Sequence, residues 1–255
     1  MSTATVPRLS AVGRGALWLT SLAVAGVLLE TAAFWHGVRR AYRFSAGARR
    51  FERRLSSQHA RVLILGDSTG VGVGAAKPED SIAGLLAADY PEADIVNVAV
   101  SGTRVAGAIA QVDECLAAGL RFDLVILCVG GNDVVADTPL PQLAADCDTL
   151  LRRLARVAAR TVWLAPPDLA LAPLFPRPYA WLLGLRSRAA AQVFAAAAAR
   201  HEVVLVDFSA PSHLAYFRKQ RRNHFAIDGF HPNSASYQYV YATARQMLGL
   251  QPHPG

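Results

Sequence analysis

Short apolar runs alternate with longer amphipathic stretches from residue 60 onward. The runs that predict buried strands are 62–65, 95–100, 124–129, 161–165 and 203–208. The stretches that predict helices are 78–90, 105–116, 140–160, 179–200 and 232–248, and a polar loop is expected over 209–229. Strands that alternate with helices in this way are typical of the α/β class. We therefore expect a doubly wound, five-stranded parallel sheet flanked by helices.

A different pattern fills the N-terminal region. Residues 16–35 are twenty positions with Glu30 as the single charge, and a helix of that length spans about 30 Å, the thickness of one hydrocarbon core. Trp18 and Trp35 stand near its two ends, where interfacial aromatic residues are common. The segment predicts a membrane anchor. The alternatives are a signal peptide cleaved after Ala33 and an amphipathic helix packed on the domain.

Arginines follow this apolar segment. Seven of them lie in residues 39–54 and two lie before residue 16, a bias that predicts a cytoplasmic position for the following domain. The alternative is a periplasmic or secreted domain after signal cleavage. Residues 39–54 are interpreted either as a basic helix on an anionic leaflet or as a solvated linker helix. The expected organisation is an anchor with its basic juxtamembrane segment over 1–59 and one domain over 60–255.

Charge excludes one class of partner. Residues 1–60 hold nine arginines and two glutamates, so their net charge is +7, whereas residues 61–255 hold seventeen basic and seventeen acidic residues. A neutral main domain does not favour nucleic-acid binding, which needs a basic face. The three cysteines, at 115, 128 and 147, lack the paired spacing of a zinc site and predict buried or free thiols rather than disulfides. The sequence does not indicate an oligomeric state.

Polar residues suited to acyl transfer follow the predicted strands. Acyl transfer requires a hydroxyl nucleophile, a base, a group that orients the base, and donors for the oxyanion. Ser68 follows the first strand, Gly102 the second and Asn132 the third. Asp228 and His231 come after the loop that follows the last strand. Since parallel strands end at one edge of a sheet, we expect these residues to converge there.

These positions resemble a known family. The stretches Gly66-Asp67-Ser68, Gly102, Gly130-Gly131-Asn132-Asp133 and Asp228-Gly229-Phe230-His231-Pro232 are similar, in order and spacing, to the four blocks of the SGNH, or GDSL, hydrolase superfamily. The resemblance covers roughly residues 60–250 and implies a flavodoxin-like fold. Thr69 departs from the Leu or Ile that is usual after the serine, which leaves the nucleophile intact but leaves the subfamily open.

The resemblance implies a role for each residue. Ser68 is the expected nucleophile, His231 the general base and Asp228 its partner, in a Ser-His-Asp triad. The backbone N–H groups of Ser68 and Gly102 and the side-chain amide of Asn132 are the expected oxyanion hole. No metal and no cofactor is expected. Although 70–75 fits a loose dinucleotide pattern, Asp67-Ser68 occupies the turn that a nucleotide would need, and strand two ends without an acid.

The predicted function is hydrolysis of a carboxylic ester through an acyl-enzyme on Ser68. Lysophospholipids, acyl thioesters and acetylated sugars remain open as substrates, with a weak preference for a lipid or acyl ester because of the anchor. The alternative is a catalytically silent binding or scaffold module with the same fold. The basic run Arg218–Arg222 is interpreted as a solvated face or as a site for a phosphate head group or an anionic lipid surface. The apolar stretch 169–185 is interpreted as core packing, an acyl-chain wall or a membrane-facing lid.

Overall fold

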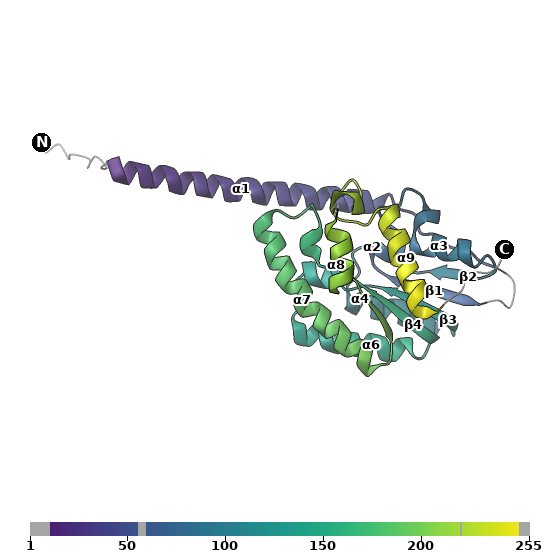
Figure 1. Ribbon diagram of the computed structural model, residues 1–255. Helices are drawn as coiled ribbons and strands as arrows, with labels where there is room; N and C mark the ends of the chain where they lie inside the picture. The colour runs from purple at the N-terminus through teal and green to yellow at the C-terminus, as the bar shows by residue number, and fades with distance from the viewer. Residues whose placement is uncertain (1–10, 56–59, 220, 250–255) are drawn as a thin grey trace, which may run out of the picture.

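A parallel sheet forms the centre of the domain. The computed structural model describes residues 11–55, 60–219 and 221–249, and within these residues five strands pair in the order β2-β1-β3-β4-β5 (Figure 1). The strands are β1 (Arg61–Gly66), β2 (Asp94–Asn97), β3 (Phe122–Cys128), β4 (Ala158–Ala165) and β5 (Val204–Asp207). All four pairings are parallel. The order reverses beside β1, so the crevice at the switch point lies at the carboxyl end of β1. The expected α/β fold is confirmed.

Helices cover both faces of the sheet because the strands are apolar on both sides. One face packs against α4 (Val105–Ala117), α6 (Leu140–Leu154) and α7 (Arg177–Arg200), and the other against α3 (Ile82–Asp89) and α9 (Ser234–Leu248). Figure 1 shows α6 and α7 on one side of the strands and α9 on the opposite side. The three cysteines are buried and unpaired, as the sequence predicts.

Four expected elements differ in detail. The helix predicted over 140–160 ends at Leu154, because residues 158–160 pair with β3 and begin β4. The helix predicted over 78–90 is a 3-10 turn, η1 (Pro78–Asp80), followed by α3, because the Ser81 side chain caps the new helix at the Gly84 N–H. The predicted polar loop 209–229 contains α8 (Pro211–Arg218) and η3 (Arg221–His224). The closing helix starts at Ser234, with Asn233 rather than Pro232 at its start, since the Asn233 side chain accepts from the Ser236 N–H.

The long first helix projects beyond the domain (Figure 1). Helix α1 (Ala11–Ala46) has 36 residues, and its part Trp18–Ala46 is long and apolar enough to cross a membrane. Every described side chain from Trp18 to Glu30 is exposed, so this part is not the buried core helix of a soluble protein. Beyond Glu30 one face of α1 contacts the domain.

Residues 47–55 also pack against the domain, which differs from the predicted separating linker. Arg53 forms two backbone hydrogen bonds with Ile95 of β2, at N···O distances of 3.0 and 2.7 Å. Its guanidinium donates to the carbonyl oxygens of Ala87, Tyr90 and Ala93. The positive charge of Arg53 is therefore used to bind the edge of the domain rather than a lipid surface.

Candidate active site

The candidate nucleophile lies at a sharp turn between β1 and a short helix. Strand β1 ends at Gly66, and α2 (Ser68–Val71) begins two residues later. Gly66 has φ of 123°, and a Cβ there would stand 1.9 Å from the Cys128 carbonyl oxygen, so a side chain is excluded. Asp67 caps α2 by accepting from the Thr69 N–H at 2.8 Å. This turn places Ser68 at the carboxyl edge of the sheet.

A buried glutamine holds this turn in place. The Gln111 side chain on α4 accepts from the Gly66 N–H at 2.8 Å and donates to the Gly66 carbonyl oxygen at 3.1 Å. Sequence reasoning missed this residue. The sequence feature that could have identified it is a polar residue on the apolar face of α4, between Ala108 and Val112. A buried amide at such a position needs hydrogen-bond partners.

The candidate base and its carboxylate partner share one loop after α8. The His231 Nδ1 lies 2.5 Å from the Asp228 Oδ2, and both side chains are buried. The other carboxylate oxygen accepts from the N–H groups of Phe230 and His231 at 3.0 and 3.1 Å. Burial alone would raise the pKa of Asp228, but these hydrogen bonds and the nearby imidazole lower it below its ordinary value. The Asp228 side chain is therefore held as a carboxylate.

The loop that carries His231 is fixed against the nucleophile turn. Gly229 has φ of 74°, and the loop closes through a hydrogen bond from the Ala226 N–H to the His231 carbonyl oxygen at 2.8 Å. A Cβ on Gly74 would meet the Pro232 carbonyl oxygen at 2.1 Å. This close approach requires glycine at position 74. Part of the glycine pattern in residues 70–75 is therefore explained by packing and not by nucleotide binding.

The glycine-rich turn after β3 supplies Asn132 and Asp133. Asn132 is in α5 (Gly131–Val135), and its amide nitrogen donates to the Thr103 carbonyl oxygen at 3.0 Å and lies 3.5 Å from the Asp67 Oδ2. Asp133 is buried and accepts from the Val105 N–H at 2.9 Å, which ties the turn to the start of α4. Asp133 thus has the structural position that the sequence indicated.

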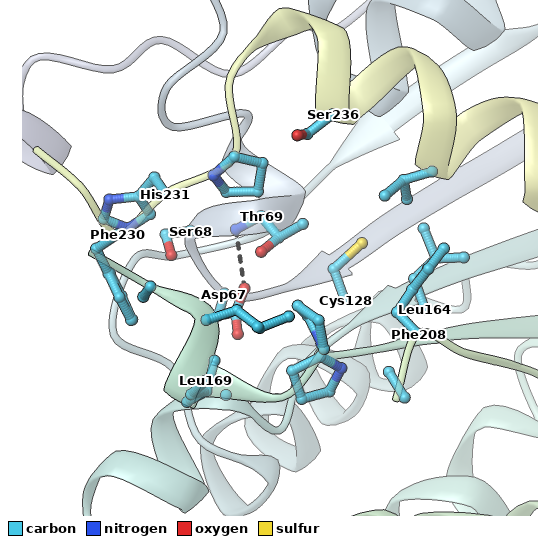
Figure 2. A pocket seen from close by; sticks show the side chains of 18 of the residues that line it. Asp67, Ser68, Thr69, Cys128, Leu164, Leu169, Phe208, Phe230, His231 and Ser236 are labelled. Carbon is cyan, nitrogen blue, oxygen red and sulfur yellow. Dashed lines mark hydrogen bonds between the residues drawn. The ribbon is translucent and has the colours of Figure 1, made fainter. Parts of the chain in front are cut away.

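The predicted residues meet at two cavities. One cavity of about 90 Å³ is lined by Ser68, Gly102, Asn132 and His231 together. A second, mostly apolar cavity of about 100 Å³ also reaches Ser68, Asn132 and His231 (Figure 2). Figure 2 shows the Ser68 and His231 side chains at one end of this cavity and Cys128, Leu164 and Phe208 toward the other. Among the contacts of the described residues, no hydrogen bond joins the Ser68 hydroxyl to His231.

Burial perturbs a second carboxyl group beside the nucleophile. Asp67 is 6% exposed, and burial raises its pKa to about 6, against lowering contributions from Thr69 and His231. Asp67 lies in the lining of the larger apolar cavity (Figure 2). Two carboxyl groups near His231 therefore have opposite pKa shifts, because Asp228 is hydrogen-bonded to the imidazole and Asp67 is mainly desolvated.

The apolar stretch 169–185 and the basic run Arg218–Arg222 were also candidates for substrate contact. Leu169 and Leu171 line the apolar cavity, whereas Trp181 and Leu182 on α7 are exposed. The stretch 169–185 is thus partly cavity wall and partly surface. The described part of the basic run Arg218–Arg222 lines neither of the two cavities at Ser68, and Gln220 together with the side chains of 221 and 222 lies outside the described residues. Across the described residues, no group of three or more His, Cys, Asp or Glu could hold a metal ion.

The fold and the cluster at the carboxyl edge of the sheet define an SGNH-type α/β hydrolase. Residues 64–239 match the model of the GDSL-like Lipase/Acylhydrolase family, and the chain belongs to that family. A GDSL-like esterase of Mycobacterium tuberculosis is 30% identical over 187 residues, which are 69% of this chain and 57% of that relative. The aligned part thus spans less than two thirds of that esterase.

Solved structures share the fold. A lipolytic protein of the G-D-S-L family from Veillonella parvula superposes with a TM-score of 0.62 at 16% identity, over 75% of this chain and 99% of that protein. A catalytic mutant of an acetylxylan esterase from Geobacillus stearothermophilus superposes with a TM-score of 0.57 at 19% identity, over 78% and 98% of the two chains. At these identities the likeness concerns the fold.

Proposed function

We propose that this protein is a serine esterase that hydrolyses carboxylic esters through an acyl-enzyme on Ser68. The observation that carries the proposal is the meeting of Ser68, Gly102, Asn132 and His231 at one cavity, with Asp228 bound to His231 at 2.5 Å. Membership of the GDSL-like family and the esterase relative from Mycobacterium tuberculosis support ester bonds as the target.

The hydrogen bond to Asp228 assigns the two imidazole nitrogens. Since Nδ1 faces Asp228, Nε2 of His231 is left to take the proton of the Ser68 hydroxyl. The Ser68 oxygen attacks the ester carbonyl carbon, and the tetrahedral intermediate expels the alcohol, which receives the proton from His231. Water then attacks the acyl-enzyme with His231 again as base, and the acid leaves with Ser68 restored. The Ser68–His231 hydrogen bond closes when substrate binds, as is common in such sites.

The oxyanion is the charge that this site must stabilise. The backbone N–H groups of Ser68 and Gly102 and the amide of Asn132 are the proposed donors. One amide hydrogen of Asn132 is fixed by the Thr103 carbonyl oxygen at 3.0 Å. The other, whose contact with the Asp67 Oδ2 is long at 3.5 Å, is the proposed donor to the oxyanion. A donor held in advance loses little freedom during the reaction, which favours stabilisation of the transition state over ground-state binding.

We further infer that α1 anchors the enzyme in a membrane. The support is its apolar composition together with the complete exposure of 18–30, because an unburied apolar helix needs a nonaqueous partner. Trp181 and Leu182, also exposed, follow Tyr179, whose hydroxyl lies 3.4 Å from that of Thr31 on α1. Exposed apolar side chains of α7 thus lie close in sequence to the residue that α1 contacts where it leaves the domain. Thr31 and Phe34 pack on the domain, which favours an anchor over a cleaved signal peptide.

The arginine bias places the domain on the cytoplasmic side in this proposal. Seven arginines lie in residues 39–54, after the apolar segment, whereas only Arg8 and Arg14 precede it. The contrasting proposal, a silent scaffold module, has less support, because it does not require the buried pair Asp228 and His231 beside Ser68.

A hydrolysis assay tests the proposed activity. The full chain in a nonionic detergent should release p-nitrophenol from p-nitrophenyl acetate or butyrate, and Ser68→Ala should abolish turnover. Ser212→Ala is the matched control, because Ser212 is an exposed serine on α8 outside both cavities. Equal rates in the Ser68→Ala and Ser212→Ala proteins would refute the assignment of the nucleophile.

A further inference from the structure

Helix α1 has a second part that belongs to the domain. From Thr31 to Ser45 its less exposed positions are 31, 34, 37, 38, 41, 44 and 45, which form one helical face. Gly37 lies at the closest approach, since a Cβ there would stand 2.3 Å from the Leu174 Cδ1. A larger residue at position 37 would require either the Leu174 side chain or α1 itself to move. The spacing of this face therefore fits a helix that packs on the domain rather than a detached spacer.

Aromatic packing links this face to the catalytic loop. The Phe34 ring stacks on Tyr179 at a centroid distance of 4.9 Å and lies 5.9 Å from the Phe175 ring. Phe175 in turn makes an edge contact with Phe230 at 5.7 Å, and Phe230 precedes His231. The orientation of α1 is thus coupled through three rings to the residue beside the proposed base.

A hydrogen bond six residues further along α1 also connects this helix to the catalytic loop. The Arg40 guanidinium donates to the Asp228 backbone carbonyl oxygen at 3.1 Å. Asp228 is the carboxylate that binds His231, and its loop also receives a hydrogen bond from the Leu174 N–H to the Gly229 carbonyl oxygen at 2.9 Å. Helix α1 and the segment beneath it therefore hold the Asp228–His231 loop from outside.

The same helix face borders the catalytic cavity. Val38, Ala41 and Ser45 of this face line the cavity of about 90 Å³ that Ser68, Gly102, Asn132 and His231 also line, and the neighbouring Tyr42 lines it as well although it is 70% exposed. This volume is small beside the roughly 300–1,000 Å³ of a typical ligand pocket. An ester whose carbonyl carbon lies at the Ser68 hydroxyl has room there for only a few further atoms before it contacts α1.

We propose that the carboxyl-terminal half of α1 is the specificity-determining wall of the active site, with Ala41 and Tyr42 as the residues that limit the ester group. The inference rests on the proposed esterase function and adds the residues that select its substrate. It also means that the helix proposed as anchor completes the catalytic pocket, which favours compact ester groups of a few carbons on the α1 side of Ser68.

Two substitutions with opposite effects test this wall. Ala41→Leu adds three carbons at the cavity, and Tyr42→Ala removes a ring from it. Arg43→Ala is the matched control, because Arg43 is exposed and adjacent to Tyr42 on α1 but lies outside the cavity lining. Each full-length protein is assayed in detergent with two substrate series, p-nitrophenyl esters from acetate to octanoate and acetates of alcohols from methyl to octyl.

The expected result is a change of preference in one of the two series. Ala41→Leu should lower kcat/KM for the four-carbon member at least about tenfold relative to the smallest member, as added methylenes in a pocket do. Tyr42→Ala should shift the optimum toward longer members, and Arg43→Ala should change neither series. If Ala41→Leu misfolds, Tyr42→Ala alone decides the question.

If a folded and active Tyr42→Ala protein has the same dependence of kcat/KM on chain length as the unsubstituted protein in both series, the proposed role of α1 is wrong. Loss of the proposed function itself has a different signature, since the unsubstituted protein would then hydrolyse neither series and its Ser68 would not react with a fluorophosphonate. Activity with altered selectivity supports the wall, and activity with unaltered selectivity refutes it.

Discussion

Replacing Asp67 by asparagine should stabilise the folded protein at neutral pH. Asp67 is buried beside Ser68, and burial raises its pKa to about 6 from an ordinary value of 3.8. At about 1.4 kcal/mol for each pH unit, this difference corresponds to about 3 kcal/mol of destabilisation when the group is ionised. Asparagine retains an oxygen to accept from the Thr69 N–H, which the structure places 2.8 Å from the Asp67 Oδ1.

The sign follows from proton binding. Between about pH 4 and pH 6 the folded protein keeps a proton on Asp67 that the unfolded chain has lost, so the stability falls as pH rises through this window. Below it both states are protonated, and the cost is absent. The Asp67→Asn protein should therefore match the unsubstituted protein near pH 4 and exceed its unfolding free energy by up to about 3 kcal/mol at pH 7.

Urea unfolding of both proteins in nonionic detergent, followed by tryptophan fluorescence from pH 4 to pH 8, measures this difference. Trp163 is fully buried and donates to the Val129 carbonyl oxygen at 3.0 Å, so its emission reports on the core. Glu114→Gln, which removes an exposed carboxylate on α4, is the control and should show no such pH dependence. A difference between the Asp67→Asn and unsubstituted proteins that is constant with pH, or that grows toward acid, would refute the reasoning.

Three further predictions concern catalysis and topology. Asn132→Ala should lower kcat by about 10²–10³ with a small change in KM, and steady-state kinetics with an unchanged kcat would remove Asn132 from the oxyanion hole. Arg40→Ala should lower kcat because Asp228 loses a backbone partner, with partial recovery in Arg40→Lys, while the neighbouring Arg39→Ala should match the unsubstituted protein; equal kinetics for Arg40→Ala and Arg39→Ala would contradict this role. A C-terminal alkaline phosphatase fusion in a bacterial host should be inactive, and an active fusion would reverse the proposed orientation.

Much of the fold of the domain could be predicted because each strand and helix is indicated by residues that are close together in the sequence. The five strands are apolar runs, and parallel pairing brings their carboxyl ends to one edge, so Ser68, Asn132 and His231 were expected to converge. The strand β2 ends at Asn97 rather than at residue 100: Val98 and Val100 still donate to β1, but the Ala99 N–H donates to the Asn97 side chain and the chain turns toward Thr103.

The supporting contacts were not predictable, since they join distant segments. Gln111 binds the backbone of Gly66 across 45 positions, and Arg40 binds that of Asp228 across 188. Hydropathy marks a polar residue on an apolar helix face, but it does not give the partner. Packing of α1 on the domain was expected only as an alternative for residues 16–35, and it was missed in 39–45 because the arginines there obscure a stripe that includes Ala41 and favour a solvated linker.

Covalent labelling tests the central claim most directly. The full-length protein in detergent is treated with a fluorophosphonate, digested and mapped by mass spectrometry, alongside the Ser68→Ala and Ser212→Ala proteins. The account predicts a single adduct on Ser68, loss of esterase activity in proportion to labelling, and an unlabelled Ser68→Ala protein with no turnover. Labelling at another residue, or full turnover by the Ser68→Ala protein, would contradict it.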